Sequence, residues 1–158
     1  MTGHNTRPPK GDDFGILSRD LPFMARTLQS LLRPEGHAIR QALDLEAGVI
    51  GVLSVIWLNP GISQNDLATS VVLKKSAVTA LVKHLEERGL VARERSQQDR
   101  RQNALTLTAD GHTLIAKIRE HTEALNDRLF ENVSAAERET FFAVMDKVVQ
   151  NLLTGSDR

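Results

Sequence analysis

The feature that most constrains the fold of this chain is a helix-like apolar stripe that leads directly into two strand-like segments. Four apolar residues recur at the i, i+3, i+4, i+7 spacing of a helix that buries one face: Val78, Leu81, Val82 and Leu85. Gly89 follows, and glycine suits the left-handed residue that ends many helices. The pattern predicts a helix over residues 74–88 with one buried and one exposed face.

Two segments of strand character follow this helix, Leu90–Arg95 and Ala104–Thr108. In the second segment, Leu105 and Leu107 alternate with threonines, as expected of a half-buried strand. The polar stretch Ser96–Asn103 separates the two segments. They are predicted to pair as a β-hairpin, or wing, with this stretch as its loop.

A shorter helix is predicted just before residue 74. Ser63 is a suitable N-cap, and Asp66 lies at the third helical position. The inner face would consist of Leu67, Ala68 and Val71. With a turn at residues 70–73, the two helices form a helix-turn-helix, an arrangement that places its second helix in the major groove of DNA.

The N-terminal half is also predicted to be helical. Leu21–Leu43 carries apolar residues at helical spacing after a capping Asp20. Pro34-Glu35-Gly36 is expected to kink or break this helix. Glu46–Leu58 is strongly apolar, so we expect a central, buried helix there.

Two further helices are predicted after the wing. Thr108 caps the first, which extends to about Phe130. Ser134-Ala135-Ala136-Glu137 is a capping box that opens the last helix. The apolar face of this last helix is wide and needs a partner, either inside the chain or on a second subunit.

Composition limits the classes of function. The chain has 158 residues and no cysteine, which excludes disulfides and thiolate zinc sites. It shows no nucleophile–base spacing and no phosphate-cradling glycine loop, so neither an enzyme nor a cofactor is expected. His112 and His121 would lie on opposite sides of one helix, which argues against a metal site. The polar N-terminus lacks the apolar core of a secretory signal and no apolar run could span a membrane, so residues 1–13 are expected to be a disordered tail of a cytoplasmic protein.

The formal net charge of zero hides a local excess of positive charge. Residues 74–103 contain eight Lys or Arg and four acids, so this segment carries +4 and the remainder of the chain carries −4. A local basic patch favours contact with phosphate, although chance clustering on a solvated surface is an alternative.

The exposed face of the helix over residues 74–88 would present small and basic side chains to DNA. Ser76 and Thr79 could reach base edges or phosphates, and Ala80 could touch a thymine methyl group. At the wing tip, Arg100 and Arg101 could enter a minor groove, with Asp99 pairing with Arg101 to position it. The alternatives are an ordinary amphipathic surface helix and a solvated charged turn. The candidate DNA-binding residues are Ser63, Gln64, Lys74, Lys75, Ser76, Thr79, Ala80, Lys83, Arg95, Asp99, Arg100 and Arg101.

These motifs together resemble the MarR (multiple antibiotic resistance regulator) family over roughly residues 20–153. The resemblance is strongest between Leu45 and Gly111. It rests on the segments Pro60–Ala68 and Ser76–Val91, on Asp99-Arg100-Arg101, on Leu107-Thr108-Ala109-Asp110-Gly111, and on the last helix with its Ser134–Arg138 start. The resemblance implies a mainly α fold: a winged helix-turn-helix with a two-stranded β wing, and N- and C-terminal helices that form a dimerisation body.

The resemblance also implies an organisation and a mode of action. Residues 14–45 and 109–158 would form the helical dimerisation region and residues 46–108 the DNA-binding lobe, in one intertwined domain. A homodimer would place two recognition helices on half-sites about 10 bp apart in a pseudo-palindrome. Family members of this kind are most often repressors released by a small molecule, commonly an aromatic carboxylate. The alternative is an effector-independent or architectural DNA-binding module controlled by a protein partner.

Candidate effector-binding residues are fewer. Arginines recur every seven residues at Arg19, Arg26, Arg33 and Arg40, which would form either an anionic effector site, a charged dimer seam or a solvated helix face. His37 lies beside this stripe, as a pH or ligand sensor or simply as a surface histidine. Trp57 could be an effector contact or part of the core. The candidates are therefore Arg26, His37, Arg40 and Trp57.

Overall fold

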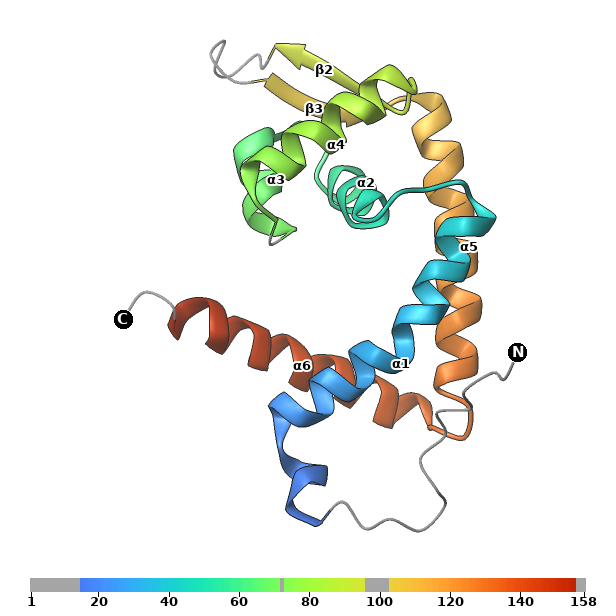
Figure 1. Ribbon diagram of the computed structural model, residues 1–158, viewed down its shortest axis with the longest axis vertical. Coiled ribbons are helices and arrows are strands. Elements are labelled where there is room, and N and C mark those ends of the chain that lie inside the picture. The colour runs from blue at the N-terminus through green and yellow to red at the C-terminus, as the bar shows by residue number, and fades with distance from the viewer. Residues whose placement is uncertain (1–14, 72, 96–102, 156–158) are drawn as a thin grey trace, which may run out of the picture. The chain divides into compact units, whose positions relative to one another are not determined.

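The computed structural model describes residues 15–71, 73–95 and 103–155, and the chain divides into two compact units, Met1–Asp44 and Leu45–Arg158. In the first unit, a short 3₁₀ helix η1 (Gly15–Arg19) precedes the long helix α1 (Leu21–Ala42) (Figure 1). The Asp20 carboxylate accepts a hydrogen bond from the backbone N–H of Phe23 at 2.9 Å, so the predicted N-cap is confirmed.

Helix α1 passes through the proline that was expected to interrupt it. Pro34 lies inside the helix, which is continuous from Leu21 to Ala42. Of the predicted kink or break at Pro34-Glu35-Gly36, the break is therefore wrong, and the kink stays a prediction. Proline removes one backbone donor. Because α1 has 22 residues, the helix continues for several turns on the N-terminal side of Pro34 and for about two turns on its C-terminal side. Gly36 is likewise accommodated within the helix.

The second unit is built around helix α2 (Val49–Leu58). Its buried face consists of Val49, Val52, Leu53 and Ile56, all of which have no exposed surface. Helix α2 packs against α3, α4, α5 and strand β3, which confirms the prediction of a central helix. It begins three residues later than predicted because Gly48, with φ of 88°, forms the turn that precedes it.

The second unit also contains a three-stranded antiparallel sheet with the order β1-β3-β2. Strands β2 (Val91–Arg95) and β3 (Asn103–Leu107) pair with Val91 opposite Leu107, which confirms the predicted hairpin. The third strand, β1 (Ile62–Ser63), pairs with β3 and was not predicted. It has only two residues, and Ser63 also caps helix α3, so its sequence carries no strand pattern of its own.

The junction between the wing and helix α5 (Ala109–Leu129) is closely packed. The Thr108 hydroxyl donates to the Gly89 carbonyl at 2.6 Å and accepts from the Gly111 N–H at 3.1 Å, which confirms Thr108 as an N-cap. The Thr108 N–H donates to the Leu90 carbonyl at 3.1 Å. Gly111 is buried, and a Cβ added to it would collide with the same Leu90 carbonyl oxygen. The start of α5 is therefore held directly against the turn between α4 and β2.

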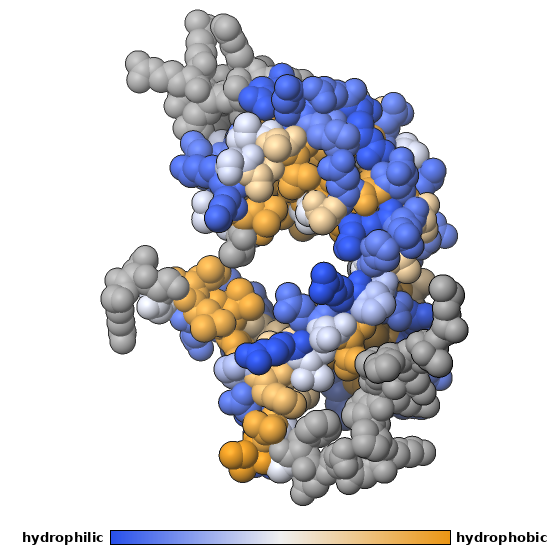
Figure 2. All heavy atoms as spheres, viewed as in Figure 1, coloured by the Kyte–Doolittle hydropathy of each residue, from blue (hydrophilic) through white to orange (hydrophobic). Residues whose placement is uncertain are grey.

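The last helix, α6 (Ala135–Gly155), has no buried residue although the structure describes all of it. Ser134 and Glu137 form the predicted capping box, and the hydrogen bonds that the Ser134 hydroxyl and backbone N–H donate lower the pKa of the Glu137 carboxyl. Apolar surface lies along α6 (Figure 2), and its exposed large apolar residues are Phe141, Phe142, Val144, Val149, Leu152 and Leu153. Among the described residues, no helix has both the length and the apolar character to cross a membrane.

Candidate nucleic-acid interface

Helices α3 (Gln64–Ser70) and α4 (Lys75–Glu87) form the predicted helix-turn-helix. Val78, Val82 and Leu85 have no exposed surface, and Leu81 is half-buried at the edge of the same face. The opposite face is exposed, and its residues are Lys75, Ser76, Thr79, Ala80 and Lys83. The division of α4 into a core face and a small, basic, solvent-facing side is therefore as predicted.

The other candidates at the start of the two helices are placed by local hydrogen bonds. The Ser63 hydroxyl donates to the Asp66 carboxylate at 2.6 Å and accepts from the Asp66 N–H at 3.1 Å, so its first role is to cap α3. Lys74 is exposed and holds the N-cap position of α4 without a capping side-chain bond. The Gln64 side chain reaches across to α4, where its Nε2 donates to Thr79 Oγ1 at 2.7 Å.

Lys83 lies within 3.7 Å of the Glu87 carboxylate one turn later on α4. The two side chains are 76% and 62% exposed, so the ion pair contributes little to stability. The ammonium group is therefore free to exchange Glu87 for a phosphate at little cost.

An ion pair that sequence reasoning missed joins the wing to α4. On Arg93 of β2, Nε and Nη2 donate to the two carboxylate oxygens of Glu86, each at 3.0 Å. The side chains are only 32% and 29% exposed. Two parallel hydrogen bonds fix orientation as well as distance. Arg93 therefore sets the position of the wing against the C-terminal end of α4 rather than adding a free positive charge to the surface.

We expect this pair to be stronger than an ordinary surface ion pair. A double-mutant cycle with Glu86→Gln and Arg93→Met is expected to give a coupling energy of about 1 kcal/mol in urea denaturation, because the geometry is bidentate and partly buried. The control is the Arg119–Glu123 pair on α5, which is 3.1 Å apart, 53% and 64% exposed, and expected to couple by about 0.3–0.5 kcal/mol. Equal coupling in the two cycles would contradict a positioning role for Arg93.

Three candidate residues at the wing tip, Asp99, Arg100 and Arg101, lie outside the described residues. Arg95 is the last residue of β2, where its backbone pairs with Asn103, and its side chain is not described. The roles of these residues remain predictions.

The effector candidates fall in different places. Arg26, Arg33 and Arg40 line one shallow hollow along α1, as their seven-residue spacing predicts. Arg19 lies outside α1 in η1, and His37 is exposed on α1 but does not line the hollow. Trp57, on α2 in the other unit, is half-buried rather than part of the fully buried core, and the Arg119 guanidinium lies 4.9 Å from the centre of its ring.

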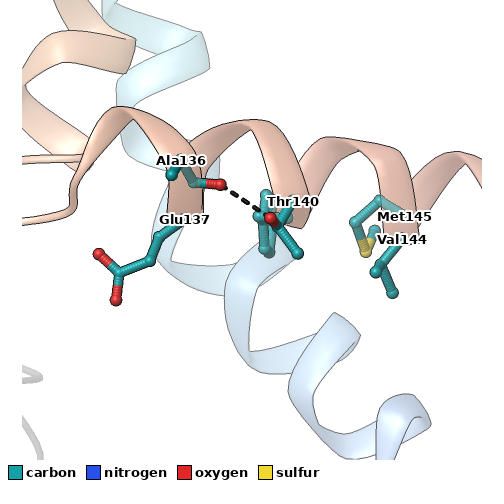
Figure 3. A pocket seen from close by; sticks show the side chains of 6 residues that line it. Ala136, Glu137, Thr140, Val144 and Met145 are labelled. Carbon is teal, nitrogen blue, oxygen red and sulfur yellow. Dashed lines mark hydrogen bonds between the residues drawn. The ribbon is translucent and has the colours of Figure 1, made fainter.

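A second hollow is apolar and lies on α6 (Figure 3). Its lining residues are Ala136, Glu137, Thr140, Phe141, Val144 and Met145. The Thr140 hydroxyl donates to the Ala136 carbonyl at 2.8 Å, so the polar atom of this side chain is satisfied within the helix. Phe130, Phe141 and Phe142 pack with ring centres 5.4–5.7 Å apart at the start of α6. The described residues contain no cluster of His, Asp or Glu that could hold a metal ion.

Comparison with known proteins identifies the family. The MarR family model matches residues 48–102. The chain is 29% identical over 153 residues to a putative transcriptional regulatory protein for the hcr operon of Thauera aromatica, covering 94% of this chain and 92% of the relative. It is 32% identical over 99 residues to the HTH-type transcriptional regulator YwhA of Bacillus subtilis, covering 63% of this chain and 71% of the relative.

Comparison with solved structures points to the same family. The transcriptional repressor CouR, bound to a 23-mer DNA duplex, is 26% identical with a TM-score of 0.75, covering 89% of this chain and 99% of CouR. A MarR-family protein of Mycobacterium tuberculosis in complex with salicylic acid is 26% identical with a TM-score of 0.65, covering 87% of this chain and 98% of that protein. These relatives are transcriptional regulators rather than enzymes, and they share the winged-helix fold described above. The chain belongs to the MarR family of transcriptional regulators.

Proposed function

We propose that this chain represses transcription as a homodimer that binds a pseudo-palindromic DNA duplex and is released by a small anionic effector. The proposal rests on helix α4, which exposes one face from Lys75 to Lys83 and buries the opposite face in the core. The fold shared with DNA-bound CouR supports insertion of this face into the major groove. We expect such a protein to act in the cytoplasm.

The wing would make the second contact with DNA. Because the Glu86–Arg93 pair holds β2 against α4, the wing tip would meet the duplex at a fixed distance from the recognition helix. Arg100 and Arg101 would then enter the neighbouring minor groove, where the negative potential is enhanced. Asp99 would hold the Arg101 guanidinium in place.

The exposed apolar surfaces of α1 and α6 support a homodimer. The exposed apolar residues of α1 are Leu21, Met24, Leu28, Leu31 and Leu32. Each helix thus leaves an apolar face of the kind that monomeric proteins usually cover. A second copy would cover these faces, and two-fold symmetry would place the two α4 helices about one turn of DNA apart.

DNA binding is expected to depend on Lys83 through phosphate contact. Lys83→Ala should weaken binding and reduce the slope of log affinity against log salt concentration by about one unit, because one fewer counterion is released. The measurement is a fluorescence-anisotropy titration at several salt concentrations. Lys147→Ala, which removes an exposed lysine of α6, serves as the control and should leave the slope unchanged. An unaltered slope for Lys83→Ala would remove this lysine from the interface.

Release by an effector has a separate test. The arginines along α1 offer positive charge to a carboxylate, and the relative from Mycobacterium tuberculosis is a complex with salicylic acid. Salicylate is expected to raise the thermal midpoint and release bound DNA, and Arg26→Gln or Arg40→Gln should reduce both effects. If salicylate and related aromatic acids change neither quantity, the alternative of a DNA-binding module controlled by a protein partner is favoured.

A further inference from the structure

A hydrogen bond between two side chains joins the first residue of α3 to the middle of α4. Gln64 Nε2 donates to Thr79 Oγ1 at 2.7 Å, although the two residues are fifteen positions apart in the sequence. Thr79 is exposed and Gln64 is half-buried. The pair therefore lies at the solvent-facing edge where α3 meets the outer face of α4.

The single proton of the Thr79 hydroxyl fixes the orientation of the amide. Thr79 Oγ1 lies 2.8 Å from the carbonyl oxygen of Lys75, which has no hydrogen to give, so the hydroxyl proton must be donated there. Thr79 Oγ1 can then act only as an acceptor toward Gln64. The nitrogen of the amide must face Thr79, and one of its two N–H groups is used in this bond.

What remains on Gln64 is one N–H donor and the whole carbonyl oxygen. A donor beside an acceptor complements the major-groove edge of adenine, which offers the N7 acceptor and the N6 amino donor. Guanine offers two acceptors there and would leave the carbonyl oxygen of Gln64 without a donor. The fixed amide thus discriminates between the two purines.

We propose that Gln64 reads an adenine in the operator and that Thr79 is the residue that positions it. The inference rests on the proposed function, since it specifies how the same face of α3 and α4 recognises a sequence. The Thr79 hydroxyl proton is already donated to the Lys75 carbonyl, so Thr79 has no donor left for a base, whereas its methyl group remains available. With Ala80 next to it, this methyl group fits the C5-methyl group of a thymine.

The same hydrogen bond could also serve only to hold α3 against α4. That structural role would affect stability without changing which base is preferred. Sequence preference is therefore the readout that distinguishes the two roles, and it has to be measured at individual base pairs.

The experiment starts from random duplex DNA enriched with the full-length wild-type protein, followed by affinity measurements on every single-base variant of the selected site. Gln64→Ala is expected to lose the preference for adenine at one position in each half-site, a loss of about 5- to 150-fold in discrimination. Thr79→Val keeps the shape and the methyl group but removes the acceptor, so it should lose the same preference. Thr79→Ser keeps the hydroxyl and should retain it, while losing discrimination at a thymine.

Replacement of the adenine by 7-deazaadenine tests the contact without altering the protein. Loss of N7 should weaken wild-type binding at that position and leave Gln64→Ala unaffected. If the wild-type protein enriches no sequence, the proposed function itself fails. If it enriches a site but Gln64→Ala keeps the same preference at every base pair, or 7-deazaadenine has no effect at any adenine, the reading role of Gln64 is overturned while DNA binding stands. Retained preference in Thr79→Val would overturn the positioning role of Thr79.

Discussion

Gly111→Ala is expected to lower the free energy of unfolding by about 3 kcal/mol, the upper range for inserting a methyl group into a closely packed site. An added Cβ would collide with the Leu90 carbonyl oxygen and would lie 3.2 Å from Leu107 Cβ. The collision cannot be relieved locally, because the same carbonyl accepts the Thr108 N–H and Thr108 caps α5. Moving either backbone would separate α5 from the wing. Urea denaturation followed by circular dichroism measures the change.

Gly51→Ala is the matched control because it makes the same chemical change in an open position. Gly51 is exposed on α2, and an added Cβ would have no neighbour within 4 Å. Alanine favours a helix over glycine, so this variant should be more stable by about 0.5–1 kcal/mol. Opposite signs for the two substitutions are the expected result. If Gly111→Ala were as stable as the wild-type protein, the close approach of Gly111 to Leu90 would be contradicted.

The elements that sequence could predict are those with a local signal. Thr108 and Ser134 carry capping signatures within four residues, and both caps are present. The apolar spacing from Val78 to Leu85 identified the buried face of α4, and alternation around Leu105 identified a strand of the hairpin. These patterns act through neighbours along the chain, so one sequence is enough to recognise them.

The features that sequence could not predict depend on contacts between distant segments. Arg93 looked like one more charge of the basic segment, because nothing local indicates that Glu86 meets it across the turn. Gln64 and Thr79 were both candidates for DNA contact, but their hydrogen bond arises only when α3 packs on α4. The break predicted at Pro34 was wrong for a related reason. The local cost of a proline can be predicted from sequence, whereas the stabilisation from the helical turns on either side of it cannot.

If the chain forms the proposed homodimer, Val149→Glu is expected to abolish dimerisation and, with it, high-affinity binding to the proposed pseudo-palindromic site. Val149 is 45% exposed on α6, in an apolar stripe that an i, i+3, i+4, i+7 pattern places on one side of the helix. The members of this stripe are Phe141, Phe142, Met145, Val148, Val149, Leu152 and Leu153. Covering a glutamate with apolar side chains of a second copy leaves a buried carboxylate without a partner, which costs several kcal/mol. The dimer dissociation constant should therefore rise by more than about 100-fold.

Gln150→Glu provides the control, because it places the same side chain one residue further along, on the polar side of α6. Both variants introduce one negative charge into the same helix, so they affect net charge and helix formation almost equally. Sedimentation-velocity centrifugation should find Val149→Glu monomeric and Gln150→Glu dimeric, with circular dichroism confirming that both are folded. A monomer can place only one α4 helix on the duplex, so its affinity for the full pseudo-palindrome should fall to that for a half-site. A dimeric Val149→Glu would mean that this stripe is not the dimer interface, and the faces of α1 would have to form that interface without it.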